Sequence, residues 1–126
     1  MPSYDASRHD PAAPVAEVIL RDNTSGAFSP PVSMLIDIGA DITLIPRAIV
    51  MQLGVKSVQE AAFELVGFDG THQMAAAVQL DMIFLQKVFR GIYLLTDDDW
   101  GILGRDVLAA VTLLLDGPRQ EWSEHQ

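Results

Sequence analysis

Short apolar runs separated by turn-forming residues extend from Val15 to Ser123, and this pattern constrains the fold more than any other feature of the chain. The runs are too short for long helices, and Gly, Pro, Asn or Asp bounds many of them, as is typical of β-strands joined by turns. One or two short helices are expected. One extends from Pro46 to Leu53, because Pro is tolerated in the first helical turn, and Gly54 ends it. The other extends over residues 107–110. The sequence therefore predicts a mostly β fold.

Several of the strand-like runs form candidate hairpins. Residues 15–20 and 32–36 flank a turn at Asn23–Gly26. Residues 62–66 and 74–80 flank Gly67–Gly70, whose Asp-Gly pair is a strong hairpin signal. Further strand-like runs are expected over residues 42–45, 82–85, 88–95, 111–115 and 120–123.

The length of 126 residues is that of a single domain. Residues 1–13 mix Pro, Ser, Asp, Arg and Ala without periodicity, which predicts a flexible N-terminal tail. Residues 14–126 contain no internal repeat and no shift in composition, so we expect them to form one domain.

Charge and composition exclude several classes of function. The formal net charge of -9 disfavours nucleic acid and anionic membrane surfaces as partners. Cysteine is absent and the three His are scattered, so we expect no metal site and no cofactor. No apolar stretch approaches the ~20 residues of a membrane span, and we expect a cytoplasmic protein.

The segment from Leu35 to Ala40 is the one that suggests chemistry. Asp37 follows an apolar strand directly and precedes Gly39-Ala40, so a carboxylate stands in a tight loop that leaves a hydrophobic core. A charge in such a place often has a function. Asp near Gly is also common in ordinary turns, and both interpretations remain open from these residues alone.

Two segments together resemble the retroviral-type, or retropepsin-like, aspartic proteases. Residues 37–46 resemble the active-site signature of that family, Asp-Thr/Ser-Gly-Ala followed by an apolar strand, and the continuation to residues 53–55 resembles its bacterial members. Residues 101–108 are similar to the apolar-Gly-Arg-Asp/Asn segment that opens the family's C-terminal helix. The resemblance spans about residues 15–123. It implies a closed, β-barrel-like aspartic protease (retropepsin) fold that is homodimeric.

The resemblance implies that Asp37 is the catalytic residue of an endopeptidase that acts on a polypeptide substrate. Amide hydrolysis by aspartates requires one ionised and one protonated carboxyl group close together, and such a pair shares a proton. The chain has one Asp-x-Gly-Ala motif and is too short for two such lobes. A second copy of the chain must therefore supply the second carboxyl group.

Further residues receive roles from the resemblance. Arg105 is expected to bond Asp41 through its planar guanidinium group, so that Arg105→Ala costs more stability than a surface substitution. The hairpin centred on Asp69 resembles the family's flap, with an ordinary surface hairpin as the alternative. Residues 111–115 and Trp122 are candidates for the dimer interface, although Trp122 could equally pack within one subunit. The expected substrate-binding residues are Gly39, Ala40, Asp41, Phe68, Asp69 and Gly70, and the expected supporting residues are Ile38 and Arg105.

Position 38 departs from the family pattern, because Ile38 stands where the family has Thr or Ser. In the family that hydroxyl group forms hydrogen bonds across the dimer axis. Loss of the hydroxyl group leaves buried polar groups without partners, which costs dimer stability about 1–3 kcal/mol for each group. Two Ile side chains that meet at the axis bury apolar area, which adds up to ~1.5–3 kcal/mol apiece to dimer stability. We therefore expect a weakened protease. The alternative is a catalytically impaired dimerisation or peptide-binding module.

A metal-dependent hydrolase is a third hypothesis, in which Asp97, Asp98 and Asp99 would hold the ion. We disfavour it, because neighbouring loop residues rarely converge on one ion without other ligands.

Overall fold

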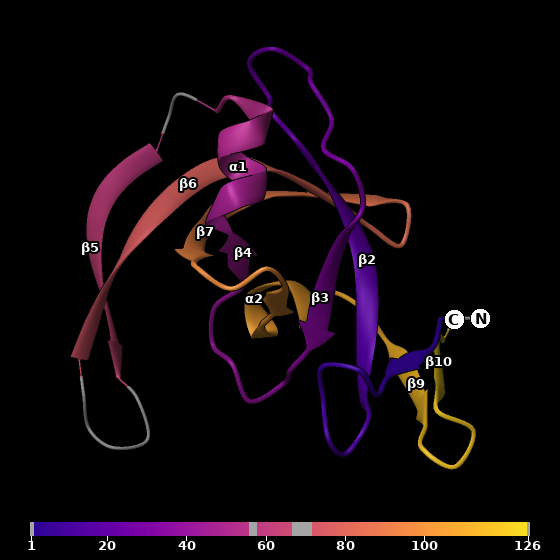
Figure 1. The fold of residues 1–126 in the computed structure, drawn as a ribbon. Coiled ribbons are helices and arrows are strands. Elements are labelled where there is room, and N and C mark those ends of the chain that lie inside the picture. Colours follow the sequence, from indigo (N-terminus) through magenta and orange to yellow (C-terminus); the bar gives the residue numbers. More distant parts are fainter. Residues whose placement is uncertain (1, 56–57, 67–71, 126) are drawn as a thin grey trace.

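The computed structural model describes residues 2–55, 58–66 and 72–125 (Figure 1). Ten strands and two short helices account for most of these residues. The strands are β1 (Tyr4–Asp5), β2 (Ala13–Arg21), β3 (Val32–Ile36), β4 (Leu44–Pro46), β5 (Val58–Val66), β6 (His72–Phe84), β7 (Lys87–Thr96), β8 (Gly101–Leu103), β9 (Leu113–Asp116) and β10 (Glu121–Glu124), and the helices are α1 (Arg47–Leu53) and α2 (Arg105–Leu108).

Six of the strands close into a barrel. Their order is β2-β3-β8-β4-β7-β6, and β6 pairs with β2 to complete the ring. Strand β5 extends the sheet beyond β6, and β1 extends it beyond β2 (Figure 1). The pairings β3–β8 and β4–β7 are parallel, and the others in the ring are antiparallel. The predicted closed, mostly β fold with one or two short helices is confirmed, and the structure has two among the described residues.

Alternating apolar residues fill the barrel. In β3 the side chains of Val32, Met34 and Ile36 are buried, and those between them are partly exposed. A strand with one buried face requires this period of two. The core also includes side chains from the other barrel strands and both helices: Val18, Leu20, Ile45, Val50, Leu80, Met82, Leu103 and Val107.

The two helices begin and end near the expected positions. Pro46 caps α1 at its N-terminus, and Gly54 ends it in the left-handed conformation, with φ 73°. Glycine adopts this conformation without a steric penalty, which makes it the usual residue just past a helix end. Helix α2 begins at Arg105, two residues earlier than expected.

One prediction about the strands is wrong. Residues 74–80 and 82–85 were expected to form two strands, but β6 continues from His72 to Phe84. The polar Asp81 between the two runs does not interrupt the strand. Its carboxylate accepts hydrogen bonds from Arg21 and Arg90, so a fully buried charge is compensated in place.

The chain ends lie close together beside the barrel (Figure 1). Strand β1 pairs with the start of β2, and the amide of Trp122 donates a hydrogen bond to the carbonyl of Pro2. Part of the segment that was expected to be a flexible tail is therefore hydrogen-bonded to β2 and β10, because these strands have unpaired backbone groups along the edges that face it. The division between a tail and a domain at residue 13 stays a prediction. No helix within the described ranges has the length and apolarity needed to cross a membrane.

Candidate active site

The order of the barrel strands explains why the two sequence motifs meet. Strand β8 lies between β3 and β4, parallel to the first and antiparallel to the second. The loop that joins β3 to β4 must therefore pass around the end of β8, where α2 begins. This brings residues 37–43 against residues 103–106, about 60 positions later in the sequence.

Asp37 follows β3 and begins this loop. Its amide donates a hydrogen bond to the Leu103 carbonyl at 3.1 Å, and its own carbonyl accepts one from the Ala40 amide at 3.1 Å. The carboxylate oxygen Oδ1 accepts a bond from the Gly39 amide at 2.9 Å. A side chain at position 39 would place its Cβ 3.1 Å from that same oxygen, so glycine keeps the carboxylate uncrowded. Asp37 is half-buried, and its orientation is set by backbone groups of its own loop.

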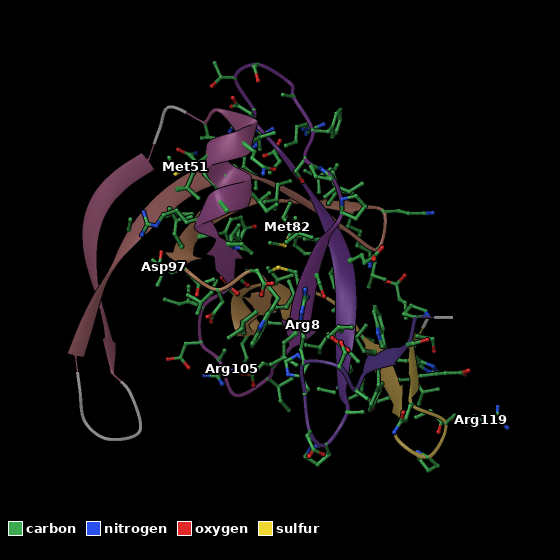
Figure 2. The ribbon with its side chains drawn as sticks, viewed as in Figure 1. Arg8, Met51, Met82, Asp97, Arg105 and Arg119 are labelled. Atoms are coloured by element: carbon green, nitrogen blue, oxygen red, sulfur yellow. The ribbon has the colours of Figure 1, made fainter. Side chains whose placement is uncertain are left out.

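Arg105 braces the loop from the start of α2 (Figure 2). Its guanidinium group donates to the carbonyl of Ile38 at 2.7 Å and to the carboxylate of Asp41, and its amide donates to the carbonyl of Ala40 at 2.9 Å. The expected bond between Arg105 and Asp41 is therefore present. Both side chains are more than half exposed, and an exposed ion pair contributes only about 0–1 kcal/mol. The loss expected from Arg105→Ala thus comes mainly from the bond to Ile38, which orders the loop.

Thr43 and Asp106 make a second brace that the sequence analysis missed. The Thr43 hydroxyl donates to Asp106 Oδ1 at 2.6 Å, the Thr43 amide donates to Oδ2 at 3.1 Å, and the Gly104 amide donates to the hydroxyl oxygen at 3.0 Å. Thr43 is fully buried. Two features of the sequence could have indicated this pair. Thr43 is the one polar residue in the apolar run 42–45, and Asp106 is an acidic residue of the second motif.

Two glycines allow β8 and α2 to approach the loop and its flanking strands. A Cβ at Gly104 would lie 2.7–2.9 Å from backbone atoms of Ile42, and one at Gly101 would lie 2.5 Å from the carbonyl oxygen of Leu44. Real Cβ atoms essentially never come so close to backbone, so larger residues would push the second motif away from the loop.

The remaining predicted residues are placed as follows. Ile38, Gly39 and Asp41 are exposed and Ala40 is half-buried, all in the Asp37 loop. Phe68, Asp69 and Gly70 lie outside the described residues, so the flap stays a prediction. The strands on either side of them, β5 and β6, pair antiparallel as far as Val66 and His72. Among the described residues no cluster of three or more His, Asp or Glu side chains could hold a metal ion.

The two interface candidates differ in burial. Trp122 is 2% exposed, packs against the ring of Phe84 and donates its indole N–H to the Val15 carbonyl at 2.8 Å. The structure therefore favours packing within one subunit for Trp122. In contrast, Leu114 and Leu115 of β9 are at least half exposed.

The closed barrel, its two short helices and the loop after β3 define the class of fold as retropepsin-like. In particular, the chain is similar to the solved structure of EIAV protease complexed with the inhibitor HBY-793. The TM-score is 0.62 at 21% sequence identity, and the match covers 78% of this chain and 86% of that chain. No protein-family model and no curated protein matches the sequence. The similarity establishes the fold, and the chemistry must be argued from the site.

Proposed function

We propose that this protein is an aspartic endopeptidase that acts as a homodimer, with Asp37 of each copy supplying one carboxyl group of the catalytic pair. The observation that carries the proposal is the position of Asp37. Its half-buried carboxylate lies at the end of a core strand, in a loop braced by Arg105, within a retropepsin-like barrel. Charged groups in such surroundings lower stability unless they have partners or a function.

The second carboxyl group is assigned to a second copy because the other carboxylates of the loop and of α2 are already engaged. Asp41 is bonded to Arg105, and Asp106 is bonded to Thr43. A two-fold axis passing beside Asp37 brings it next to the same residue of the partner. Two carboxyl groups about 3 Å apart cannot both ionise, so the pair holds one proton between them.

Hydrolysis then follows the general chemistry of such a pair. The ionised carboxylate takes a proton from water as the water oxygen attacks the peptide carbonyl carbon, while the protonated carboxyl group donates to the carbonyl oxygen. The pair then gives its proton to the amide nitrogen and takes one from a hydroxyl group of the tetrahedral diol. The C–N bond breaks, and the pair again holds one proton. The substrate is an extended polypeptide, which suits a site bordered by strands and covered by the proposed flap over residues 67–70.

A second function is favoured by one observation. Ile38 has no hydroxyl group to brace the partner loop, and its side chain is 73% exposed. Loosely held loops misplace the carboxyl groups, and small displacements lower the rate sharply. The alternative is thus a dimerisation or peptide-binding module with little hydrolytic activity.

Incubation with an unfolded polypeptide from pH 3 to pH 7, with and without a statine-type inhibitor, tests both proposals. Asp37→Asn is the test variant, and Asp10→Asn, an equal charge change at an exposed residue, is the control. We expect inhibitor-sensitive cleavage by the wild type and the control, and none by Asp37→Asn. Cleavage that persists in Asp37→Asn removes Asp37 from the mechanism. Peptide binding without cleavage at every pH supports the module.

A further inference from the structure

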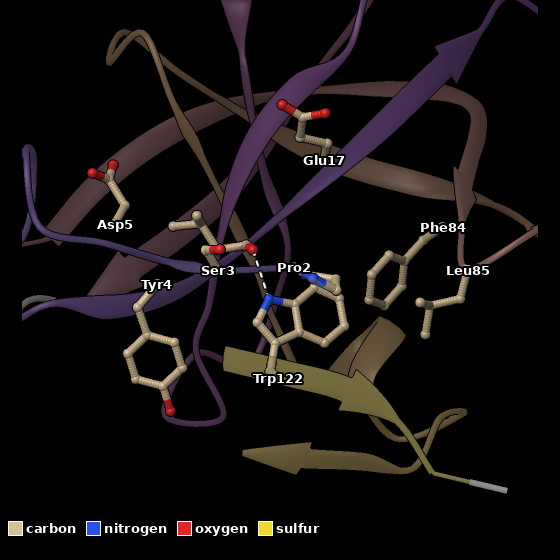
Figure 3. A pocket seen from close by; sticks show the side chains of 9 residues that line it. Pro2, Ser3, Tyr4, Asp5, Glu17, Phe84, Leu85 and Trp122 are labelled. Atoms are coloured by element: carbon tan, nitrogen blue, oxygen red, sulfur yellow. Dashed lines mark hydrogen bonds between the residues drawn. The ribbon is translucent and has the colours of Figure 1, made fainter. Parts of the chain in front are cut away.

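A pocket of about 530 Å³ lies beside the chain ends, between β1, β2, β10 and the turn that joins β6 to β7. This size is within the range of small-molecule sites, roughly 300–1,000 Å³. Figure 3 shows Trp122 near its centre, with Phe84 and Leu85 to one side and Tyr4 to the other. None of its lining residues belongs to the Asp37 loop or to α2, so the pocket is separate from the candidate active site.

The floor of the pocket is apolar and closely packed. Trp122 and Phe84 are each 2% exposed, and their rings are in contact with centroids 6.1 Å apart. The single polar atom of the indole is already used, because Nε1–H donates to the Val15 carbonyl at 2.8 Å (Figure 3). Trp122 and Phe84 thus close the bottom of the pocket. The accessible apolar surface comes from the partly exposed side chains of Tyr4, Val15 and Leu85, which favours a ligand with an apolar body.

The charged groups of the pocket have one sign. Asp5 and Glu17 line it, whereas no Lys, Arg or His among the described residues does. Neither carboxylate has an ion-pair partner among the described residues. Lys87, two residues after Leu85, is paired with Glu124 at 2.7 Å and is not free to neutralise them. Hydrogen bonds from Ser7 hold the pKa of Asp5 below its usual range, so this carboxyl group stays ionised at neutral pH.

We propose that this pocket binds a small organic cation, an ammonium or guanidinium group carried on an apolar body. The carboxylates of Asp5 and Glu17 match the charge, and the partly exposed side chains of Tyr4, Val15 and Leu85 match the apolar body. An anion of the same shape meets two like charges at the rim. A neutral molecule of the same shape gains the apolar contact alone.

Three probes with one shape and different charge test the proposal on the full chain. They are 2-phenylethylammonium, 2-phenylethanol and phenylacetate, titrated at constant ionic strength. The readout is the indole N–H resonance of Trp122, with that of Trp100, which does not line the pocket, as the internal reference. We expect a saturable shift at Trp122 with the ammonium probe, at a Kd on the order of 1 mM. The neutral probe is expected to bind about two- to fivefold more weakly, and phenylacetate more weakly still.

Glu17→Gln is the test variant, because Glu17 is exposed and its substitution leaves the core intact. We expect it to weaken the ammonium probe about two- to fivefold, with no change for 2-phenylethanol. Asp98→Asn, an equal charge change at an exposed residue outside the pocket, is the control and is expected to leave binding unchanged. Equal binding of the ammonium and neutral probes, an equal effect of the two variants, or no saturable shift at Trp122 overturns the proposal. None of these readouts requires peptide cleavage, so the result is independent of the proposed protease activity.

Discussion

Ile38 exposes 73% of its surface at the tip of the Asp37 loop, although burial of an Ile side chain is worth about 1.5–3 kcal/mol. Its carbonyl oxygen accepts a hydrogen bond from Arg105, so the backbone of the loop is held while the side chain points into solvent. On the proposed two-fold axis the two Ile38 side chains would cover each other. An apolar contact would then replace the hydroxyl bonds found in the family that the sequence resembles.

Replacing Ile38 with Thr is expected to raise peptide-cleavage activity, measured as kcat/KM, about tenfold or more, because hydroxyl bonds across the axis would hold the two carboxyl groups in register. Ile38→Val is the matched control, since it keeps the branched shape and adds no hydroxyl group. Equal activity of the Thr and Val variants would show that bonds across the axis are dispensable here.

Thr43 is the residue whose hydroxyl group joins the two motifs, and Thr43→Val removes that group with little change in shape. The variant leaves an oxygen of Asp106 and the Gly104 amide without their partner. Hydrogen bonds to charged groups are worth about 1.5–3 kcal/mol, and we expect a loss of that size in the free energy of unfolding, measured by urea denaturation. Thr112→Val, at an exposed Thr, is the control and is expected to change stability by less than about 0.5 kcal/mol.

At the scale of elements, the buried carboxylate of Asp81 joins three barrel strands. Asp81 lies on β6 and accepts hydrogen bonds from Arg21 on β2, at 2.7 Å, and from Arg90 on β7, at 2.9 Å. Its side chain is fully buried, whereas both arginines reach solvent. The bonds from Arg90 and Arg21 hold the pKa of Asp81 below its ordinary value, although burial opposes this shift. The β2–β6 pairing that closes the barrel is thus strengthened by an ionised group.

The sign of this pKa shift predicts a dependence of stability on pH. Because the folded-state pKa is lower than the unfolded one, the contribution of Asp81 is complete above about pH 5 and is lost as pH falls through the lowered pKa. We expect Asp81→Asn to lower the free energy of unfolding by about 1–3 kcal/mol at pH 7, and by less at pH 3. Urea denaturation at both pH values measures the difference. A destabilisation that is the same at both would contradict this role.

At the scale of the whole molecule, β9 is the strand edge best placed to meet a second copy. Among the described residues β9 pairs with β10 alone, while backbone bonds to Pro2 and Tyr4 occupy the other side of the β10 segment. Leu114 and Leu115 of β9 are at least half exposed. An exposed apolar edge strand is a template for pairing with another chain. We infer that the proposed dimer forms a shared sheet along this edge.

Leu114→Asp is expected to weaken the dimer by placing two charges in an apolar contact. Sedimentation equilibrium should show a larger fraction of monomer, and cleavage activity should fall in parallel, because a monomer would supply only one carboxyl group of the proposed pair. Val88→Asp, at an apolar residue of similar exposure on β7, is the control and is expected to leave both measurements unchanged. A Leu114→Asp protein that stays dimeric would place the interface elsewhere.

Features that depend on neighbouring residues could be predicted from the sequence. Pro46 and Gly54 bound α1, turn residues bound β2 and β3, and the motif around Asp37 identified the candidate loop. The Arg105–Asp41 bond was also expected, because each partner belongs to a recognisable motif. Local backbone preferences and short motifs are properties of a few adjacent residues, so they can be read without knowledge of the fold.

Apart from the Arg105–Asp41 bond, which the family resemblance implied, only the tertiary structure decided which distant residues meet. It placed β8 between β3 and β4, joined Thr43 to Asp106 across 63 positions, and made Asp81 a buried partner of two arginines rather than a break between strands. It also placed Trp122 in the core of its own subunit, at the floor of a pocket. No periodicity in the chain encodes these contacts, because they depend on strand order, and strand order is determined by how the whole barrel closes and buries its apolar side chains.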